Sequence, residues 1–206
     1  MIFMQGTPTT DHQKNHFYKK GLQALEKKNY AYALELFQEV LAEYPDCLEC
    51  YHHLWNAARA LREQEQKSGQ SFIRRLRSFG LRLSAAVLMA QRKIPAAMKT
   101  LERATLLTPD SIPALHRLAI IFLQNKNPAG AQCAWEQILL LDQNNLPALK
   151  QLCRLYYDTK QYPLAKSTAQ RILKITRTDL DAETILKDIA ALGAIEGGFD
   201  SIKPAT

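Results

Sequence analysis

The sequence has no long apolar run and few cysteines. Its most apolar stretch, LRLSAAVLMAQ (81–91), is interrupted by an arginine and falls short of the roughly 20 apolar residues that a membrane-spanning helix needs. The first 13 residues contain no basic segment followed by an apolar one, so we expect no signal peptide but a flexible leader (1–13) on a cytoplasmic protein. In that compartment the four cysteines are expected to be reduced thiols.

Acidic residues are missing between Gln66 and Leu101, although the chain contains 20 of them. Because the same segment holds eight basic residues, the formal net charge of +7 is concentrated there. The eight are Lys67, Arg74, Arg75, Arg77, Arg82, Arg92, Lys93 and Lys99. A nearly neutral chain with one basic block predicts contact with an acidic partner surface rather than general binding of polyanions.

A catalytic constellation is also missing. No nucleophile, base and orienting residue stand at a spacing that identifies them. The run GAIEGG (193–198) has neither a strand before it nor a helix after it, as a phosphate-binding loop requires. The sequence therefore predicts neither an enzyme nor a cofactor.

The run PDCLECYHHLW (45–55) contains cysteines and histidines at a spacing that suits metal ligands. Asp46 is a natural N-cap for a helix that starts near Leu48, and this helix would present Cys47, Cys50 and His53 on one face. A closed zinc site needs a fourth ligand, and the other cysteines lie far along the chain. A redox CxxC usually precedes a helix in a βαβ unit, and no strand is apparent here. We therefore predict structural thiols and no metal.

A period of 34 residues relates the segments 112–145 and 146–179. The matching pairs are Pro113 with Pro147, Ala114 with Ala148, Leu115 with Leu149, Leu118 with Leu152, Ala131 with Ala165, and Ile138 with Ile172. The segment 78–111 continues the pattern one period earlier, whereas 14–47 matches it at an offset that is four residues short of two periods. The repeat between them is therefore shortened.

This pattern resembles the tetratricopeptide repeat (TPR), whose units are helix-turn-helix hairpins. The resemblance covers about residues 14–179 and implies an all-α, TPR-like α-solenoid, a right-handed superhelix of such hairpins. Its repeats would be 14–47, 48–77 (irregular), 78–111, 112–145 and 146–179. Residues 180–193 predict a capping helix with Asp179 as its N-cap, and 194–206 a loop-like tail.

Repeat two is irregular because Trp55 occupies the place of a small residue. An indole there would keep the second helix of the hairpin away at the normal spacing. Either this repeat has a truncated second helix, or one long helix of about 20 residues replaces two and packs against Trp55.

The resemblance also implies a function: a non-catalytic scaffold or adaptor that binds a partner peptide or helix in a concave groove. The groove-facing register falls on Tyr18, Leu22, His52, Asn56, Arg59, Arg82, Met89, His116, Leu123, Lys150, Arg154 and Tyr157. One equivalent position reads His52, Arg82, His116 and Lys150. Such a row of cations suits an acidic segment or a C-terminal carboxylate. The alternative interpretation is that these residues are ordinary solvated side chains without a binding role.

Some TPR proteins grip the carboxyl end of chaperones with a clamp of lysines, asparagines and an arginine. Here His52 and Asn56 match that clamp only in part, Leu83 stands in the place of an asparagine, and Pro113 in the place of a lysine. Chaperone binding is therefore not predicted, and a homo-oligomer is compatible with the sequence.

An alternative hypothesis for the function concerns the positively charged helix expected at 71–93. Phe72, Leu76, Phe79 and Leu83 recur at helical spacing, and Arg74, Arg75 and Arg77 lie off that stripe. Such a helix can contact an anionic membrane or a nucleic acid. We favour the simpler prediction that the stripe packs on Trp55 and repeat three, with the arginines in solvent.

Overall fold

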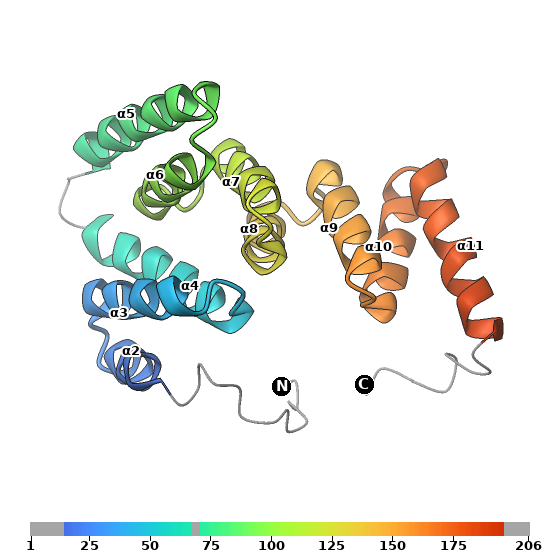
Figure 1. Cartoon of the computed structure of the whole chain (residues 1–206), viewed down its shortest axis with the longest axis horizontal. Coiled ribbons are helices and arrows are strands. Elements are labelled where there is room, and N and C mark those ends of the chain that lie inside the picture. The colour runs from blue at the N-terminus through green and yellow to red at the C-terminus, as the bar shows by residue number, and fades with distance from the viewer. Residues whose placement is uncertain (1–14, 67–70, 196–206) are drawn as a thin grey trace. The chain divides into compact units, whose positions relative to one another are not determined.

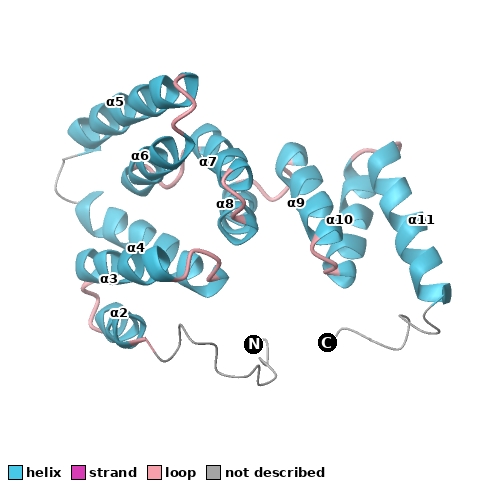
Figure 2. Cartoon of the chain, viewed as in Figure 1, coloured by secondary structure: helices cyan, strands magenta, loops and turns pink. Residues whose placement is uncertain are grey.

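The computed structural model describes residues 15–66 and 71–195, and within these ranges it contains ten helices and no strand. Figures 1 and 2 show the helices. They are α2 (His16–Glu26), α3 (Tyr30–Glu43), α4 (Leu48–Gln66), α5 (Ser71–Ala90), α6 (Ile94–Leu107), α7 (Ile112–Gln124), α8 (Pro128–Leu141), α9 (Leu146–Asp158), α10 (Tyr162–Ile175) and α11 (Leu180–Ile195). The prediction of an all-α fold of helical hairpins is confirmed. The expected leader (1–13) and nearly all of the expected tail (194–206) lie outside the described residues.

The turns inside the hairpins repeat with the same geometry. Lys28, Arg92, Lys126 and Lys160 have φ values of 57°, 57°, 56° and 60°, in the left-handed region that a non-glycine residue rarely adopts. The residue after each of them donates its backbone N–H to the carbonyl five residues earlier, as from Asn127 N to Phe122 O at 2.8 Å. The last three positions follow the 34-residue period, and between Lys28 and Arg92 the described residues contain no other non-glycine residue with a positive φ. The described part of the segment 48–77 therefore contains no turn of this kind.

Repeat two instead contributes α4 and the beginning of α5. α5 is a single helix of 20 residues that runs from the end of repeat two through the first half of repeat three. Of the two alternatives that the sequence left open, the structure has the long merged helix. Trp55 is buried, with 1% of its surface exposed.

The chain forms two compact units, Met1–Gln137 (unit 1) and Ile138–Thr206 (unit 2). In unit 1, α2 packs on α3, α3 on α4, α5 on α6, and α6 on α7. Its core contains the large side chains Phe37, Trp55, Phe122 and Trp135. Close approach depends on Gly130, because a Cβ atom there would lie 2.8 Å from the Phe122 ring.

The start of α4 is joined to the turn between α7 and α8 within unit 1. Asn127 donates hydrogen bonds from Nδ2 to the carbonyl of Pro45 (2.8 Å) and to the Tyr51 hydroxyl (2.9 Å). The rings of Tyr51 and Phe122 meet edge to face with their centroids 5.3 Å apart. Residues about 80 positions apart thus fix α4 in the absence of a regular second repeat.

The cysteines differ from expectation at one pair. Cys47 and Cys50 form a disulfide at the start of α4, so the prediction of four reduced thiols is wrong for these two. Their separation of three residues places both on the same side of one helical turn, which brings the sulfur atoms together. Cys133 and Cys153 are free and buried.

Unit 2 contains α9, α10 and α11 around a compact core. Leu149, Cys153, Ala169, Ile172 and Ala182 are buried there together. Asp179 caps α11, since its Oδ1 accepts a hydrogen bond from the backbone N–H of Ala182 at 3.1 Å, so the predicted N-cap is confirmed. Within the described ranges, no helix of either unit is both long and apolar enough to cross a membrane.

Candidate functional site

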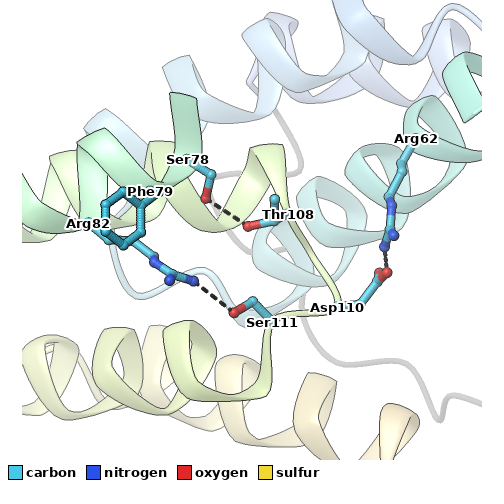
Figure 3. A pocket seen from close by; sticks show the side chains of 7 residues that line it. All are labelled: Arg62, Ser78, Phe79, Arg82, Thr108, Asp110 and Ser111. Atoms are coloured by element: carbon cyan, nitrogen blue, oxygen red, sulfur yellow. Dashed lines mark hydrogen bonds and ion pairs between the residues drawn. The ribbon is translucent and has the colours of Figure 1, made fainter. Parts of the chain in front are cut away.

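A cavity of about 370 Å³ in unit 1 contains the predicted site residue Arg82. Figure 3 shows the side chains that line it, which come from α4, from α5 and from the turn between α6 and α7. They are Arg62, Ser78, Phe79, Arg82, Thr108, Asp110 and Ser111. α5 lines one wall, and the α6–α7 turn lines another.

Arg82 is the cationic group of this cavity that has no acidic partner among the described residues. Its Nη1 donates a hydrogen bond to the neutral hydroxyl Oγ of Ser111 at 3.2 Å. Its guanidinium carbon lies 6.0 Å from the centroid of the Phe79 ring. By contrast, Arg62 forms an ion pair with Asp110 on the other side of the cavity. The guanidinium of Arg82 is therefore the positive group that an anion in this cavity would contact.

The remaining wall of the cavity is neutral and polar. Ser78 and Thr108 share a hydrogen bond of 2.8 Å between their hydroxyls. Ser78 Oγ also lies 2.9 Å from the carbonyl oxygen of Ala104, to which it donates. These bonds anchor α5 to the end of α6, so the position of Arg82 is fixed relative to Ser111.

The other predicted residues of unit 1 lie elsewhere, and most have partners. His52 Nε2 lies 3.2 Å from Glu136 Oε2, and its Nδ1 lies 3.6 Å from the thiol of Cys133. Arg59 donates a hydrogen bond to the Asn56 side chain at 2.8 Å. His116 is half-buried on α7. These residues do not line the cavity at Arg82.

Tyr18 has 7% of its surface exposed and belongs to the core around Phe37. Its hydroxyl lies 3.4 Å from Glu49 Oε2 and 3.5 Å from His53 Nε2. Burial, with the Glu49 carboxylate nearby, raises the pKa of Tyr18 to about 12. Burial likewise lowers the pKa of His53. A partner would find little accessible surface at Tyr18.

The predicted residues of unit 2 lie along α9, and two of them contact acidic residues at the N-cap of α11 and within that helix. Lys150 Nζ forms an ion pair with Asp179 at 2.6 Å, and the Tyr157 hydroxyl donates to Asp188 at 3.4 Å. The hydrogen bond from Lys150 holds the pKa of Asp179 below its usual range. Arg154 is exposed. In this unit the predicted cation Lys150 is therefore already matched by a carboxylate.

The basic helix has an exposed face. Arg77 is exposed on α5, while the side chains of Arg74 and Arg75 lie outside the described part of the chain. Leu76, Phe79 and Leu83 are 61%, 58% and 60% exposed. The prediction that the apolar stripe packs on Trp55 and repeat three is wrong for these three residues, and the side chain of its fourth member, Phe72, lies outside the described part of the chain.

A second cavity, of about 650 Å³, lies in unit 1 between α3, α6 and the α7–α8 turn. It is lined among others by Glu102, whose pKa burial raises to about 7. Neither a hydrogen-bond donor nor an ion-pair partner of this carboxylate is found among the described residues. The sequence shows no signal for it, because its burial depends on segments far apart in the chain.

The thiols and histidines near the start of α4 do not form a metal centre. Within 15–66 and 71–195, no three His, Cys, Asp or Glu side chains are placed to hold one ion. Both sulfur atoms of the CxxC pair are engaged in the disulfide.

The paired helices and the recurring turns define an all-α protein built of helical hairpins. No protein-family model and no curated protein matches the sequence. Several solved structures are similar to the chain in fold. The Arabidopsis OM64 TPR domain is 14% identical, with a TM-score of 0.49, and the match covers 58% of this chain and 98% of that domain.

Two further solved structures are similar to the chain. A TPR protein of Thermus thermophilus is 18% identical, with a TM-score of 0.44, over 84% of this chain and 96% of that protein. The first TPR domain of Spaghetti, bound to an HSP90 peptide, is 16% identical, with a TM-score of 0.49, over 58% of this chain and 94% of that domain. Because these identities are low, the function proposed below rests on the chain's own residues.

Proposed function

We propose that the protein is a non-catalytic scaffold that binds an acidic segment of a partner protein, and that the cavity at Arg82 recognises a carboxylate of that segment. The observation that carries this proposal is the pairing of Arg82 with the neutral Ser111 hydroxyl in an open cavity of about 370 Å³. A guanidinium without a carboxylate partner gains most from one that arrives with a ligand.

The size and surroundings of the cavity support a side chain or a chain terminus as the bound group. About 370 Å³ is close to the lower limit of ligand pockets, so the rest of a peptide would lie outside it. Phe79 is 58% exposed beside Arg82 and offers an apolar contact next to the charge. The basic segment 67–101 extends the positive potential along α5, which favours association with acidic chains.

Fluorescence anisotropy on the full chain tests the proposal with a defined probe. The probe is a fluorescein-labelled peptide of six Asp and Glu residues with a free C-terminal carboxylate. We expect R82E to weaken binding at least about tenfold, since a charge-assisted hydrogen bond becomes a repulsion. R82K should be intermediate, because lysine keeps the charge but not the forked geometry. An amidated probe separates recognition of the chain end from recognition of side chains.

The matched control is R177E, a charge reversal at an exposed arginine that does not line the cavity. It changes the net charge of the chain as much as R82E does. If R82E and R177E bind the probe equally well, or if the wild-type chain does not bind it, the proposal is wrong. Far-UV circular dichroism of each variant verifies that the helices are intact.

A further inference from the structure

The outer face of α5 carries a stripe of exposed apolar side chains. Leu76, Phe79, Leu83 and Val87 are 61%, 58%, 60% and 51% exposed, and their spacing places them along one side of the helix. We call these four residues the α5 stripe. The opposite side of α5, with Ser78 and Ala85, is buried and packs mainly on α6. Figure 1 shows α5 beside α6.

The face of α5 next to the stripe lacks the neighbour that the equivalent helices have. Gly80 has no atom within 4 Å of a Cβ built on it, whereas Ala114 and Ala148, one and two periods later, are buried. Ser84 is exposed, whereas its equivalents Leu118 and Leu152 are buried. The described residues of the segment 48–77 form α4 and the start of α5 and supply no separate second helix to cover this face, which accounts for the exposure.

The missing neighbour does not account for the apolar character of the stripe. Leu83 is equivalent to Arg117 and Gln151, which are both exposed and polar. At this position the later repeats place a polar residue in water, and α5 places a leucine there. Three large apolar side chains within two helical turns, all more than half exposed, indicate a surface that is covered by something else.

The charges around the stripe define what can cover it. Arg77 is exposed on α5, and Arg92 and Lys93 are exposed just beyond its end. No acidic residue lies between Gln66 and Leu101 to balance them. Two copies of the chain that met through α5 would bring like charges together, which opposes a dimer on this face. An anionic partner is complementary.

We propose that the α5 stripe docks on an anionic lipid bilayer. The stripe lies along one helix, and an amphipathic helix can enter the boundary between headgroups and acyl chains without a matching groove. Arg77, Arg92 and Lys93 would contact the negatively charged headgroups. An acidic protein would need its own groove of complementary shape, and a nucleic acid would not require the leucines.

Vesicle co-sedimentation of the full chain tests this docking. We expect binding to phosphatidylcholine vesicles in which roughly one lipid in three is phosphatidylserine, and little binding to pure phosphatidylcholine. The double variant L76S/L83S should lower the ratio of bound to free protein about tenfold or more, because two apolar side chains no longer enter the bilayer. R77E or a rise in salt to about 0.5 M should lower it as well.

The controls separate this docking from the proposed peptide binding. L140S removes a leucine that is also 60% exposed but lies on α8, and it should leave vesicle binding unchanged. Leu76 and Leu83 do not line the cavity at Arg82, so L76S/L83S should still bind the acidic peptide. Phe79 lines that cavity and is therefore left intact.

A direct readout follows the stripe itself. Cys133 and Cys153 are buried and the other two cysteines are in a disulfide, so L83C gives one accessible thiol for an environment-sensitive dye among the described residues. Anionic vesicles should shift its emission to the blue, and L140C should show no shift. The proposal is overturned if anionic vesicles do not bind the wild-type chain, or if they bind L76S/L83S equally well, as a purely electrostatic contact of the nucleic-acid kind would.

Discussion

The hairpin α5–α6 of unit 1 and the helices α9 to α11 of unit 2 follow the same repeat pattern, yet their charged groups are matched to different degrees. In unit 2, Lys150 pairs with Asp179 at 2.6 Å. In unit 1, Arg82 bonds to a neutral serine, and Glu102 on α6 has a raised pKa, about 7, because of its burial. The position in the repeat thus fixes where a residue lies on its helix, and the neighbouring segment decides which groups its side chain contacts.

The apolar residues show the same contrast. Leu152 on α9 is 1% exposed and lies within unit 2, whereas Ser84 at the equivalent position of α5 is exposed. At this position α9 is covered within unit 2, whereas α5 presents both charge and apolar area outward. That difference is why both proposals concern α5.

The largest expected effect is on stability at these equivalent positions. L152A should lower the free energy of unfolding of unit 2 by about 2–5 kcal/mol, since it removes buried methyl groups and leaves a cavity. S84L should change stability by no more than about 0.5 kcal/mol, since the position is exposed. Hydrogen exchange of the amides in α9 and α5 measures each change locally. Equal effects at the two positions would contradict the difference in packing.

The second prediction compares two glycines of unit 1. G130A should destabilise by about 1–3 kcal/mol, because its Cβ would lie 2.8 Å from the Phe122 ring, which Tyr51 contacts on another side. G80A should stabilise by about 0.5–1 kcal/mol, because alanine favours a helix and nothing lies within 4 Å. Urea denaturation followed by tryptophan fluorescence checks both. A loss of stability in G80A would show that α5 has a neighbour there.

The third prediction concerns the pH dependence that Glu102 adds to unit 1. Its pKa is about 7 in the folded chain against 4.5 ordinarily, so the folded state favours the protonated carboxyl. The contribution of this group to the free energy of unfolding is fully present below pH 4.5 and is lost as the pH rises through 7. E102Q should therefore be about 1–2 kcal/mol more stable than the wild type at pH 8 and equally stable at pH 4. Chemical denaturation at the two pH values measures this. A benefit at pH 4 alone would refute the assignment.

The smallest effect is expected at the matched pair of unit 2. Lys150 lowers the pKa of Asp179, so the pair contributes stability above pH 3.8 that is lost as the pH falls through the lowered value. K150M should raise the pKa of Asp179, as NMR titration of its carboxyl carbon would show, and should cost little stability because Lys150 is partly exposed. R154M, one turn further along α9, is the control and should leave that pKa unchanged.

Much of the fold could be predicted because TPR hairpins are local. The 34-residue period matched Ala114 with Ala148, which are both buried, and the helical pattern after residue 179 predicted Asp179 as the N-cap of α11. Each hairpin needs only its own two helices and turn, and a turn such as the one at Lys126 forms from adjacent residues.

The candidate site could be predicted only in part. Arg82 was singled out by its register, but its cavity and its hydrogen bond to a neutral hydroxyl depend on Arg62 of α4 and on Ser111 of the α6–α7 turn. The raised pKa of Glu102 and the exposure of Leu83 were not anticipated, because the pattern of one repeat does not report which repeat is missing a neighbour. The Cys47–Cys50 disulfide was local and was still missed, since the expected compartment argued against it.

The sequence by itself determined the helices, their pairing into hairpins, the capping of α11 and the concentration of positive charge on α5, because these follow from periodicity and from contacts within about one repeat. Only the tertiary structure decided which faces are covered. Asn127 bonds to Pro45, 82 residues away, so that α4 is held by the α7–α8 turn and α5 is left with α6 as its main neighbour. Burial depends on the whole folded chain, so residues at equivalent positions of the helical pattern are buried in one repeat and exposed in another.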